Sequence, residues 1–335
     1  MPSSMYKFIP EIAMLDVAAT SKPRIAISAC LSGHSVRYNG GHKASELCRE
    51  QLEQHFDWLP VCPEVAIGLG VPRDPIRLVG DPDHPAVVST RNPGMDLTGP
   101  LRSYGEQMAN ELNDICGYIF MQKSPSCGLA RVKVYQDNGH PAPQGGTGAY
   151  AGAFCALRPD LPVEEEGRLH DPVLRENFIS RVYAYADWQR LLSEGLSRGA
   201  LVRFHSRYKY LLMANNPHAY RQLGRLLGSM SRDDDPQVIG PRYFSALMQA
   251  LRRCASRGTH GNVLQHLSGY FKGALTQQDK AELAHIIDQY QQGFVPLVVP
   301  LTLLKHYLRK HPDPYLLQQA YLQPHPDSLG LRNAV

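Results

Sequence analysis

The sequence has no uninterrupted run of about 18 apolar residues, which is the length that a membrane-spanning helix requires. Its best candidate, residues 294–304, is short and is broken by two prolines. Near the N-terminus Lys7 is followed by Pro10 and Glu11 rather than by a continuous apolar core, so a secretory signal is not expected. These absences predict a protein of the cytoplasm that has no membrane partner.

Paired C-x-x-C motifs, which mark many zinc and redox sites, are also absent. Structural disulfides are rare in the cytoplasm, so the seven cysteines, an odd number, are expected to be core residues, metal ligands or reactive thiols. Four of them lie in helical settings, where a free cysteine is usually a small buried apolar residue. These four are Cys48, Cys116, Cys155 and Cys254.

Charge is distributed unevenly along the 335 residues, a length that predicts two domains. Residues 1–200 carry 19 Lys and Arg against 23 Asp and Glu, which gives a net charge of −4. Residues 201–335 carry 16 Lys and Arg against 8 Asp and Glu, which gives a net charge of +8. An acidic first half joined to a basic second half predicts two separate tasks.

The first half predicts an α/β domain with a mostly parallel sheet, because short β-branched strands alternate with helices. Strands are expected at residues 24–30, 58–62, 76–79, 86–89 and 117–121, and helices at 43–56, 98–115 and 149–157. The Pro-rich, acidic tract 158–172 is interpreted as a domain boundary.

Beyond this tract the sequence predicts an all-α domain. Helices are expected at residues 173–196, 200–214, 217–230, 241–257, 259–272, 276–292 and 300–310. The expected organisation is a leader at 1–22, an α/β domain at 23–170, a bridging helix at 171–198 and an all-α domain at 199–325.

Three further cysteines share one kind of position. Cys30, Cys62 and Cys127 each lie at or just past the end of a predicted strand and are followed by turn residues. The carboxyl ends of parallel strands meet at one edge of a sheet, where such folds bind ligands. Three thiolates with an open fourth position are typical of a catalytic metal or cluster site, and the spacing alone does not separate zinc from iron–sulfur.

Polar side chains accompany two of these cysteines. Glu64 follows Cys62 after one proline and is a candidate acid or base, or a carboxylate that favours the start of a helix. Ser124 and Ser126 flank Pro125 just before Cys127, as catalytic or substrate-binding hydroxyls or as ordinary turn residues.

Two loops are candidates for binding the substrate. Arg37, Asn39 and Lys43 surround a diglycine before a predicted helix, which is typical of an anion or base-edge site and also of a solvated loop. Gly146 and Gly148 lie in a Gly-Gly-Thr-Gly run that is able to bring backbone N–H groups close to a ligand.

The basic second half carries pairs of arginines with helical spacing. Arg203 with Arg207, and Arg221 with Arg225, stand four residues apart, so each pair lies on one helix face. Lys209 stands between two tyrosines. Cations with nearby aromatic rings favour RNA binding, whereas a solvated amphipathic face is the alternative.

Several motifs together resemble the thiouracil desulfurase family, TudS. They are S-x-C-L-x-G and R-Y-N-G-G-H-K in residues 28–43, C-P-E-V-x-x-G-L-x-V-P-R at 62–73, S-P-S-C-G at 124–128 and G-T-G-A-Y-A at 146–151. The resemblance spans about residues 22–170. Segments 199–213 and 223–228 resemble the YbgA-type helical domain. Tyr208 departs from that pattern, which has a second histidine there.

The resemblance implies a [4Fe–4S] cluster that Cys30, Cys62 and Cys127 hold and that keeps one open iron for the sulfur of the substrate. It implies that Glu64 and Ser124 assist the hydrolysis, with Ser126 as the other candidate serine. The fusion resembles the RudS family of tRNA 4-thiouridine desulfidases. This implies that tRNA is the partner, and that sulfur leaves 4-thiouridine as sulfide without a change of redox state.

Two other functions stay open on the sequence. One is a desulfurase of free thiouracil or other thiopyrimidines, in which the helical domain serves dimerisation. The other is a non-catalytic RNA-binding protein or redox sensor that carries a metal or a cluster. No obligate protein partner is evident, and the sequence is compatible with a homodimer.

Overall fold

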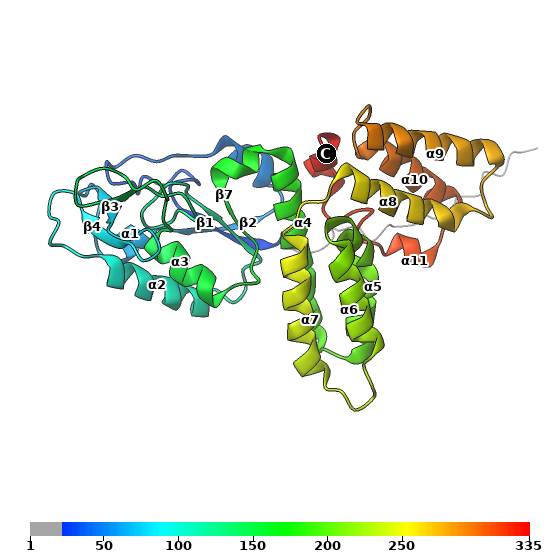
Figure 1. Cartoon of the computed structure of the whole chain (residues 1–335), viewed down its shortest axis with the longest axis horizontal. Helices are drawn as coiled ribbons and strands as arrows, with labels where there is room; N and C mark the ends of the chain where they lie inside the picture. Colours follow the sequence, from blue (N-terminus) through cyan, green and yellow to red (C-terminus); the bar gives the residue numbers. More distant parts are fainter. Residues whose placement is uncertain (1–21) are drawn as a thin grey trace, which may run out of the picture. The chain divides into compact units, whose positions relative to one another are not determined.

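The computed structural model describes residues 22–335, which divide into two compact units (Figure 1). One unit comprises Lys22–Leu196 together with Asp235–Arg252, and the other comprises Ser197–Asp234 together with Arg253–Val335. The expected leader falls almost entirely outside the described residues. The α/β domain with a mostly parallel sheet and the mostly helical second half are confirmed.

The main sheet of the first unit is parallel throughout. Its four strands run in the order β2-β1-β5-β7, with bounds Asp57–Val61, Arg24–Ser28, Gly117–Phe120 and Val163–Glu165. Ile25 and Ile27 of β1 are fully buried, because helices and loops cover a central parallel strand on both faces. All four strands end at the same edge.

The interpretation of the tract 158–172 as a boundary is wrong for its middle part, which forms β7 and the short helix η3 (Glu166–His170). Glu165 is buried, and its Oε1 atom accepts a hydrogen bond from the backbone N–H of Leu129 at 3.0 Å. A carboxylate is tolerated inside when it is hydrogen-bonded. Because the tract is acidic, the sequence did not indicate that one of its glutamates, Glu165, faces the interior from a strand.

A second sheet of three strands lies in the same unit, in the order β4-β3-β6. The strands β3 (Ile76–Val79) and β4 (Ala86–Ser89) form an antiparallel pair, and β6 (Val134–Tyr135) runs parallel to β3. Leu78 and Val134 are fully buried in the small core beneath them.

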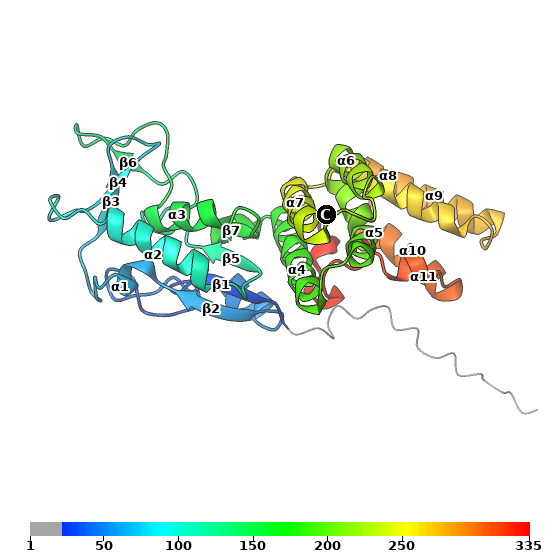
Figure 2. The ribbon, with the colours of Figure 1, turned by 90° about the horizontal axis from the view of Figure 1, so that it is seen from below.

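The first helices of this unit are η2 (Leu47–Leu52), α1 (Pro63–Ala66), α2 (Thr98–Glu111) and α3 (Ala149–Leu157). The expected helix at 149–157 is confirmed, whereas those expected at 43–56 and 98–115 are shorter than the pattern predicts. The helix expected at 43–56 shrinks to η2, because the N–H groups of Lys43 and Ser45 already donate to the carbonyls of Cys30 and Leu31. The helices α2 and α3 pack side by side in both views (Figures 1 and 2).

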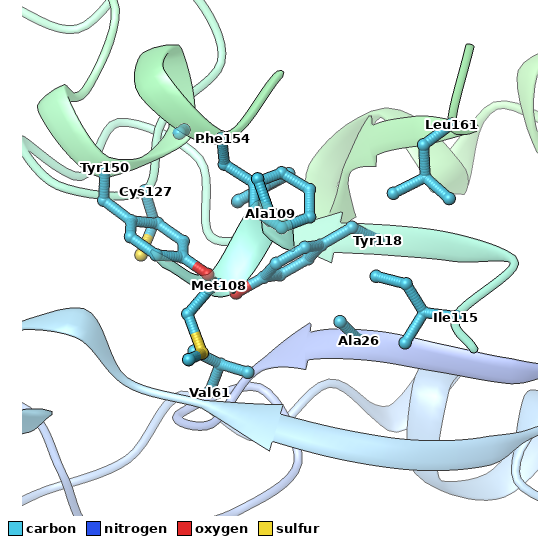
Figure 3. Packing of buried hydrophobic residues seen from close by; sticks show 12 residues of the cluster. Ala26, Val61, Met108, Ala109, Ile115, Tyr118, Cys127, Tyr150, Phe154 and Leu161 are labelled. Carbon is cyan, nitrogen blue, oxygen red and sulfur yellow. Dashed lines mark hydrogen bonds between the residues drawn. The ribbon is translucent and has the colours of Figure 1, made fainter. Parts of the chain in front are cut away.

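Aromatic rings fill the core between the main sheet and these helices (Figure 3). Tyr118 and Tyr150 are fully buried, and their hydroxyl oxygens lie 3.2 Å apart in a hydrogen bond. Phe120 and Phe154 pack against them, and Cys127 lies beside Tyr150 in the same cluster. The loop that carries Cys127 therefore packs against the buried aromatic core of the domain.

Two long helices complete the first unit, namely α4 (Pro172–Glu194) and α7 (Pro236–Leu251). The Trp188 and Phe244 rings stack at 4.6 Å between them, and the Asn177 side chain donates to the Leu251 carbonyl. The expected start of α7 at 241 is wrong, since the helix begins five residues earlier at Pro236, where Asp235 caps it, and Pro241 lies inside it.

The other unit consists of helices. They are α5 (Arg198–Asn215), α6 (Pro217–Gly228), α8 (Arg257–Ser268), η4 (Gly269–Phe271), α9 (Gln277–Gln292), α10 (Val298–Lys310), α11 (Pro314–Leu317), η5 (Asp327–Leu329) and η6 (Leu331–Asn333). Ser197, Asn216, Ser256 and Thr276 cap four of them with a side-chain oxygen. None of the helices in residues 22–335 is both long and apolar enough to cross a membrane.

The close contact of α2 with α3 gives a stability prediction. A Cβ atom at Gly105 would lie 2.6 Å from the Tyr150 carbonyl oxygen, whereas one at Gly99 of the same helix meets nothing within 4 Å. We expect Gly105→Ala to lower the free energy of unfolding by about 1–3 kcal/mol. Gly99→Ala is the control and should change it by about 0.5 kcal/mol or less. Urea unfolding followed by circular dichroism measures both, and equal effects would contradict the packing described.

Candidate active site

One cavity of about 400 Å³ lies at the carboxyl edge of the main sheet. Cys30 lies two residues past β1, Cys62 directly follows β2, and Cys127 lies in the loop after β5. All three cysteines line the cavity. Of the other expected site residues, it is also lined by Arg37, Lys43, Glu64, Ser124 and Ser126.

The loops that carry the first two cysteines are held by the backbone of the neighbouring strands. The N–H of Ala29 donates to the carbonyl of Val61 at 2.9 Å, which ties the end of β1 to the end of β2. The chain then turns through Gly33, whose φ of +97° favours glycine. Cys30 and Cys62 are thereby fixed next to each other at the sheet edge.

The loop Ser124–Gly128 is held from behind by the start of α3. The N–H groups of Gly148 and Ala149 donate to the carbonyls of Gly128 and Pro125 at 2.8 and 3.1 Å. A Cβ atom at Gly148 would lie 2.6 Å from the carbonyl carbon and oxygen of Ser126, so only glycine fits. Backbone groups of α3 therefore fix the position of Cys127.

The Gly-Gly-Thr-Gly run is not among the residues that line this cavity. The N–H of Gly146 donates to the Val132 carbonyl at 2.8 Å, and that of Gly148 to Gly128, so both are used inside the protein. The structure thus does not bring Gly146 and Gly148 to the cysteines. It places them behind the Cys127 loop, where close packing accounts for the glycines.

Of the three thiols, that of Cys127 is buried and those of Cys30 and Cys62 are half-buried. Burial, and secondarily the neighbouring Cys62, raises the pKa of Cys30 to about 11. Burial also raises the pKa of Cys62, and it raises that of Cys127 further, with Glu64 contributing. Thiols of this kind become thiolates when a cation binds them, and they release their protons as it does.

Donor chemistry indicates what this cavity is able to hold. Within residues 22–335, no group of three His, Cys, Asp or Glu side chains stands close enough for a single metal ion. An iron–sulfur cluster has a different requirement, because each cysteine sulfur binds a separate iron atom of the cluster. The cysteines therefore stand around the whole cluster and need not meet at one atom. Three thiols and no histidine line the cavity, and soft sulfur ligands suit iron–sulfur clusters. The residues present therefore fit such a cluster.

A buried ion pair holds Glu64 on the first turn of α1. Its Oε2 atom accepts hydrogen bonds from Nε and Nη2 of Arg73 at 2.9 and 2.7 Å. The Arg73 side chain is only 5% exposed, and it also donates to the carbonyls of Val36 and Gly70. In the sequence Arg73 is the last residue of the motif at 62–73. The structure shows that its donors bind Glu64 and the loop backbone.

The second carboxylate oxygen of Glu64 faces the serine loop. The Ser126 hydroxyl donates to Glu64 Oε1 at 2.6 Å, and the Ser124 hydroxyl oxygen lies 3.0 Å from that of Ser126. Since the Ser126 proton is directed to Glu64, Ser124 is the donor to Ser126. Ser126 is fully buried and contacts the acid directly, whereas Ser124 reaches it only through Ser126.

Only some of the expected polar residues in the loop with the diglycine reach the cavity. Arg37 and Lys43 line the cavity, and the Arg37 guanidinium lies 5.6 Å from the centre of the Tyr38 ring. Asn39 is exposed and accepts a hydrogen bond from the N–H of Gly41, so it shapes the turn rather than the cavity wall. Two of the three expected polar residues are thus positioned to meet a ligand.

The cationic residues expected to bind RNA lie on α5 and α6 of the helical unit. Arg203, Arg221 and Arg225 are exposed. Arg207 is half-buried, and its guanidinium donates to the Gln318 carbonyl at 3.4 Å. Lys209 lies over two tyrosine rings.

Cysteines at the ends of parallel strands, beside a held carboxylate, define a candidate cluster-dependent enzyme. Two protein families match the chain. Residues 25–166 match the 2-thiouracil desulfurase family, and residues 209–326 match DUF1722, a family of proteins of unknown function. The chain therefore belongs to the 2-thiouracil desulfurase family and joins it to a DUF1722 domain, which confirms the predicted fusion.

Individual relatives resemble parts of the chain. It is 33% identical over 159 residues to YbgA of Escherichia coli (strain K12), which covers 48% of this chain and 94% of YbgA. It is 32% identical over 113 residues to YbbK of Bacillus subtilis (strain 168), which covers 31% of this chain and 72% of YbbK. The solved [4Fe–4S]-dependent thiouracil desulfidase TudS is 30% identical, covers 45% of this chain and 95% of its own, and superposes with a TM-score of 0.34.

The ion pair of Glu64 with Arg73 gives a prediction of its own. Arg73→Met keeps much of the side-chain volume but leaves the carboxylate of Glu64, whose side chain is only 15% exposed, without its ion-pair partner. We expect the free energy of unfolding to fall by about 3 kcal/mol or more.

Arg91→Met is the matched control, because Arg91 and Asp74 form an ion pair whose side chains are 79% and 44% exposed. Its removal should cost about 1 kcal/mol or less. Urea unfolding measures both variants. If Arg73→Met unfolds at the same urea concentration as the control, the buried pair does not hold the site.

Proposed function

We propose that the chain is an iron–sulfur-dependent desulfidase that removes sulfur from 4-thiouridine in tRNA and releases uridine and sulfide. The observation that carries the proposal is the single cavity in which three cysteine thiols meet the Glu64–Ser126 pair. The match of residues 25–166 to the 2-thiouracil desulfurase family supports the chemistry. The basic helical unit supports a substrate larger than a free base.

Cys30, Cys62 and Cys127 would hold a [4Fe–4S] cluster through one iron atom each. When bound, such a cluster with one open iron supplies a Lewis acid for the thiocarbonyl sulfur and stabilises the leaving sulfide. The remaining functions fall to side chains around the cavity. They position the base, hold the attacking water and move its proton.

Glu64 is placed to act as the general base. Arg73 holds one carboxylate oxygen through two hydrogen bonds, which fixes the direction of the carboxylate. The other oxygen meets Ser126, and Ser124 continues the hydrogen-bonded chain. A water held at this pair loses a proton to Glu64, directly or through the serine hydroxyls.

The atoms of the reaction balance without an external reductant. The water oxygen bonds to the ring carbon that carried sulfur, and the carbon–sulfur bond then breaks. Sulfur leaves as sulfide and takes up protons, one of which Glu64 returns. No electrons are transferred overall, since one oxygen replaces one sulfur at the same carbon.

Positive charge at the cavity suits a nucleotide. Arg37 and Lys43 line the wall beside Cys30, where they would meet a phosphate or a ring carbonyl of the bound base. In a folded tRNA the target base is stacked, so it must be extruded to enter a cavity of about 400 Å³.

The helical unit would provide the grip on the rest of the RNA. Arg203, Arg221 and Arg225 are exposed on α5 and α6, and Arg207 and Lys209 lie on α5. Residues 201–335 carry a net charge of +8, which favours contacts with phosphates. Binding through such contacts weakens as the salt concentration rises, because the release of counterions from the phosphates is then less favourable.

The second candidate is a desulfurase of free thiouracil, which the name of the matching family favours. The deciding experiment compares the holoenzyme, reconstituted without oxygen, on thiolated tRNA and on free thiouracil. We expect sulfide release and loss of the thiouridine absorbance with tRNA, at a kcat/KM at least about tenfold above that of the free base. An intact enzyme that acts on the free base alone would overturn the tRNA proposal.

The contact of Ser126 with Glu64 predicts an order of two variants. Ser126→Ala removes the one hydroxyl within residues 22–335 that donates directly to Glu64, and we expect turnover to fall about a hundredfold or more. Ser124→Ala removes the outer hydroxyl and should cost less, about tenfold. Single-turnover sulfide release measures both, with iron content checked as a control for the site. The reverse order would assign the catalytic role to Ser124.

A further inference from the structure

A cluster of tyrosines surrounds Lys209 in the helical unit. The Lys209 ammonium lies 4.8 Å from the centre of the Tyr210 ring and 4.7 Å from that of Tyr315. The Tyr270 ring stacks on Tyr315 at 5.7 Å with an angle of 19° between the planes. The four residues come from α5, η4 and α11, so distant segments of the chain build this cluster.

Tyr270 is the exposed member of the cluster. It is 44% exposed, whereas Tyr210 is 4% exposed and Tyr315 is half-buried. The Tyr210 hydroxyl donates to the Tyr270 hydroxyl at 3.1 Å, which fixes the outer ring at its polar end. An aromatic ring that is held by stacking and by a hydrogen bond, yet reaches solvent, loses little conformational entropy when a ligand stacks on it.

The charge next to this ring points to the class of ligand. The Lys209 ammonium faces two aromatic rings, whereas the Asp313 carboxylate near Tyr315 accepts hydrogen bonds from the first N–H groups of α11. Lys272 is exposed two residues after Tyr270. A flat ring beside positive charge is complementary to an unpaired nucleobase and its phosphate, because every base has a face to stack and every linkage is anionic.

We propose that Tyr270, supported by Tyr315 and Tyr210, is a stacking platform for an unpaired base of the RNA substrate, and that Lys209 supplies positive charge to the adjoining phosphate. This inference rests on the proposed function and adds the place at which the helical unit holds single-stranded RNA. It also separates the grip on RNA from the cavity in which sulfur is removed.

The test measures tRNA affinity of the holoenzyme by fluorescence anisotropy at fixed salt. We expect Tyr270→Ala to weaken binding about 5- to 100-fold, which is the range for loss of one base–aromatic stack. Tyr270→Phe keeps the ring and should bind within about threefold of the parent. Lys209→Gln should reduce the slope of log Kd against log salt by about one.

Phe294→Ala is the matched control, since Phe294 is an aromatic residue of the same unit that is 73% exposed. It should bind tRNA as the parent does. Circular dichroism and turnover of free thiouracil verify that each variant is folded and active. These readouts separate loss of the platform from loss of the fold.

Three outcomes would overturn the inference in distinguishable ways. If the parent binds tRNA and Tyr270→Ala binds it equally well, the platform is wrong while the proposed function stands. If Tyr270→Ala changes only the molecular mass in solution, the surface is a contact between copies of the chain. If the parent does not bind tRNA, both the proposed function and the platform fail.

Discussion

Parallel pairing of β1 with β2 on one side and with β5 on the other is the constraint on which the site depends. Because the strands point the same way, chain segments that lie far apart in sequence end at one edge. Cys62 follows one of these ends directly, Cys30 follows another after one residue, and Cys127 follows the third after a short loop. The sheet therefore gathers three thiols that no local motif brings together.

Burial and hydrogen bonding then make this edge chemically useful. The same low-polarity setting that disfavours free thiolates strengthens the pair of Glu64 with Arg73. One carboxylate oxygen of Glu64 accepts hydrogen bonds from Arg73, and the other accepts one from Ser126. In the proposed reaction Glu64 needs no rearrangement before it accepts a proton, and such preorganisation is a general source of catalytic rate.

The sequence predicted those features that depend on neighbouring residues, and it did not predict those that depend on contacts between distant segments. Strand positions such as 76–79 and 86–89, and the three cysteines at strand ends, follow from β-branched runs and turn residues. The roles of Gly148 and Arg73 do not, because they depend on the Ser126 backbone and on Glu64. The sequence did not predict β7 either, because its buried Glu165 depends on a hydrogen bond from the distant Leu129 N–H.

The central claim is that Cys30, Cys62 and Cys127 together hold one cluster in the cavity beside Glu64. The most direct measurement is iron and sulfide content after reconstitution without oxygen, with electron paramagnetic resonance of the reduced protein. The parent should contain one [4Fe–4S] cluster per chain, each single Cys→Ser variant of the three should lose most of it, and Cys254→Ser should keep it. Full cluster content and turnover in Cys127→Ser would contradict the account.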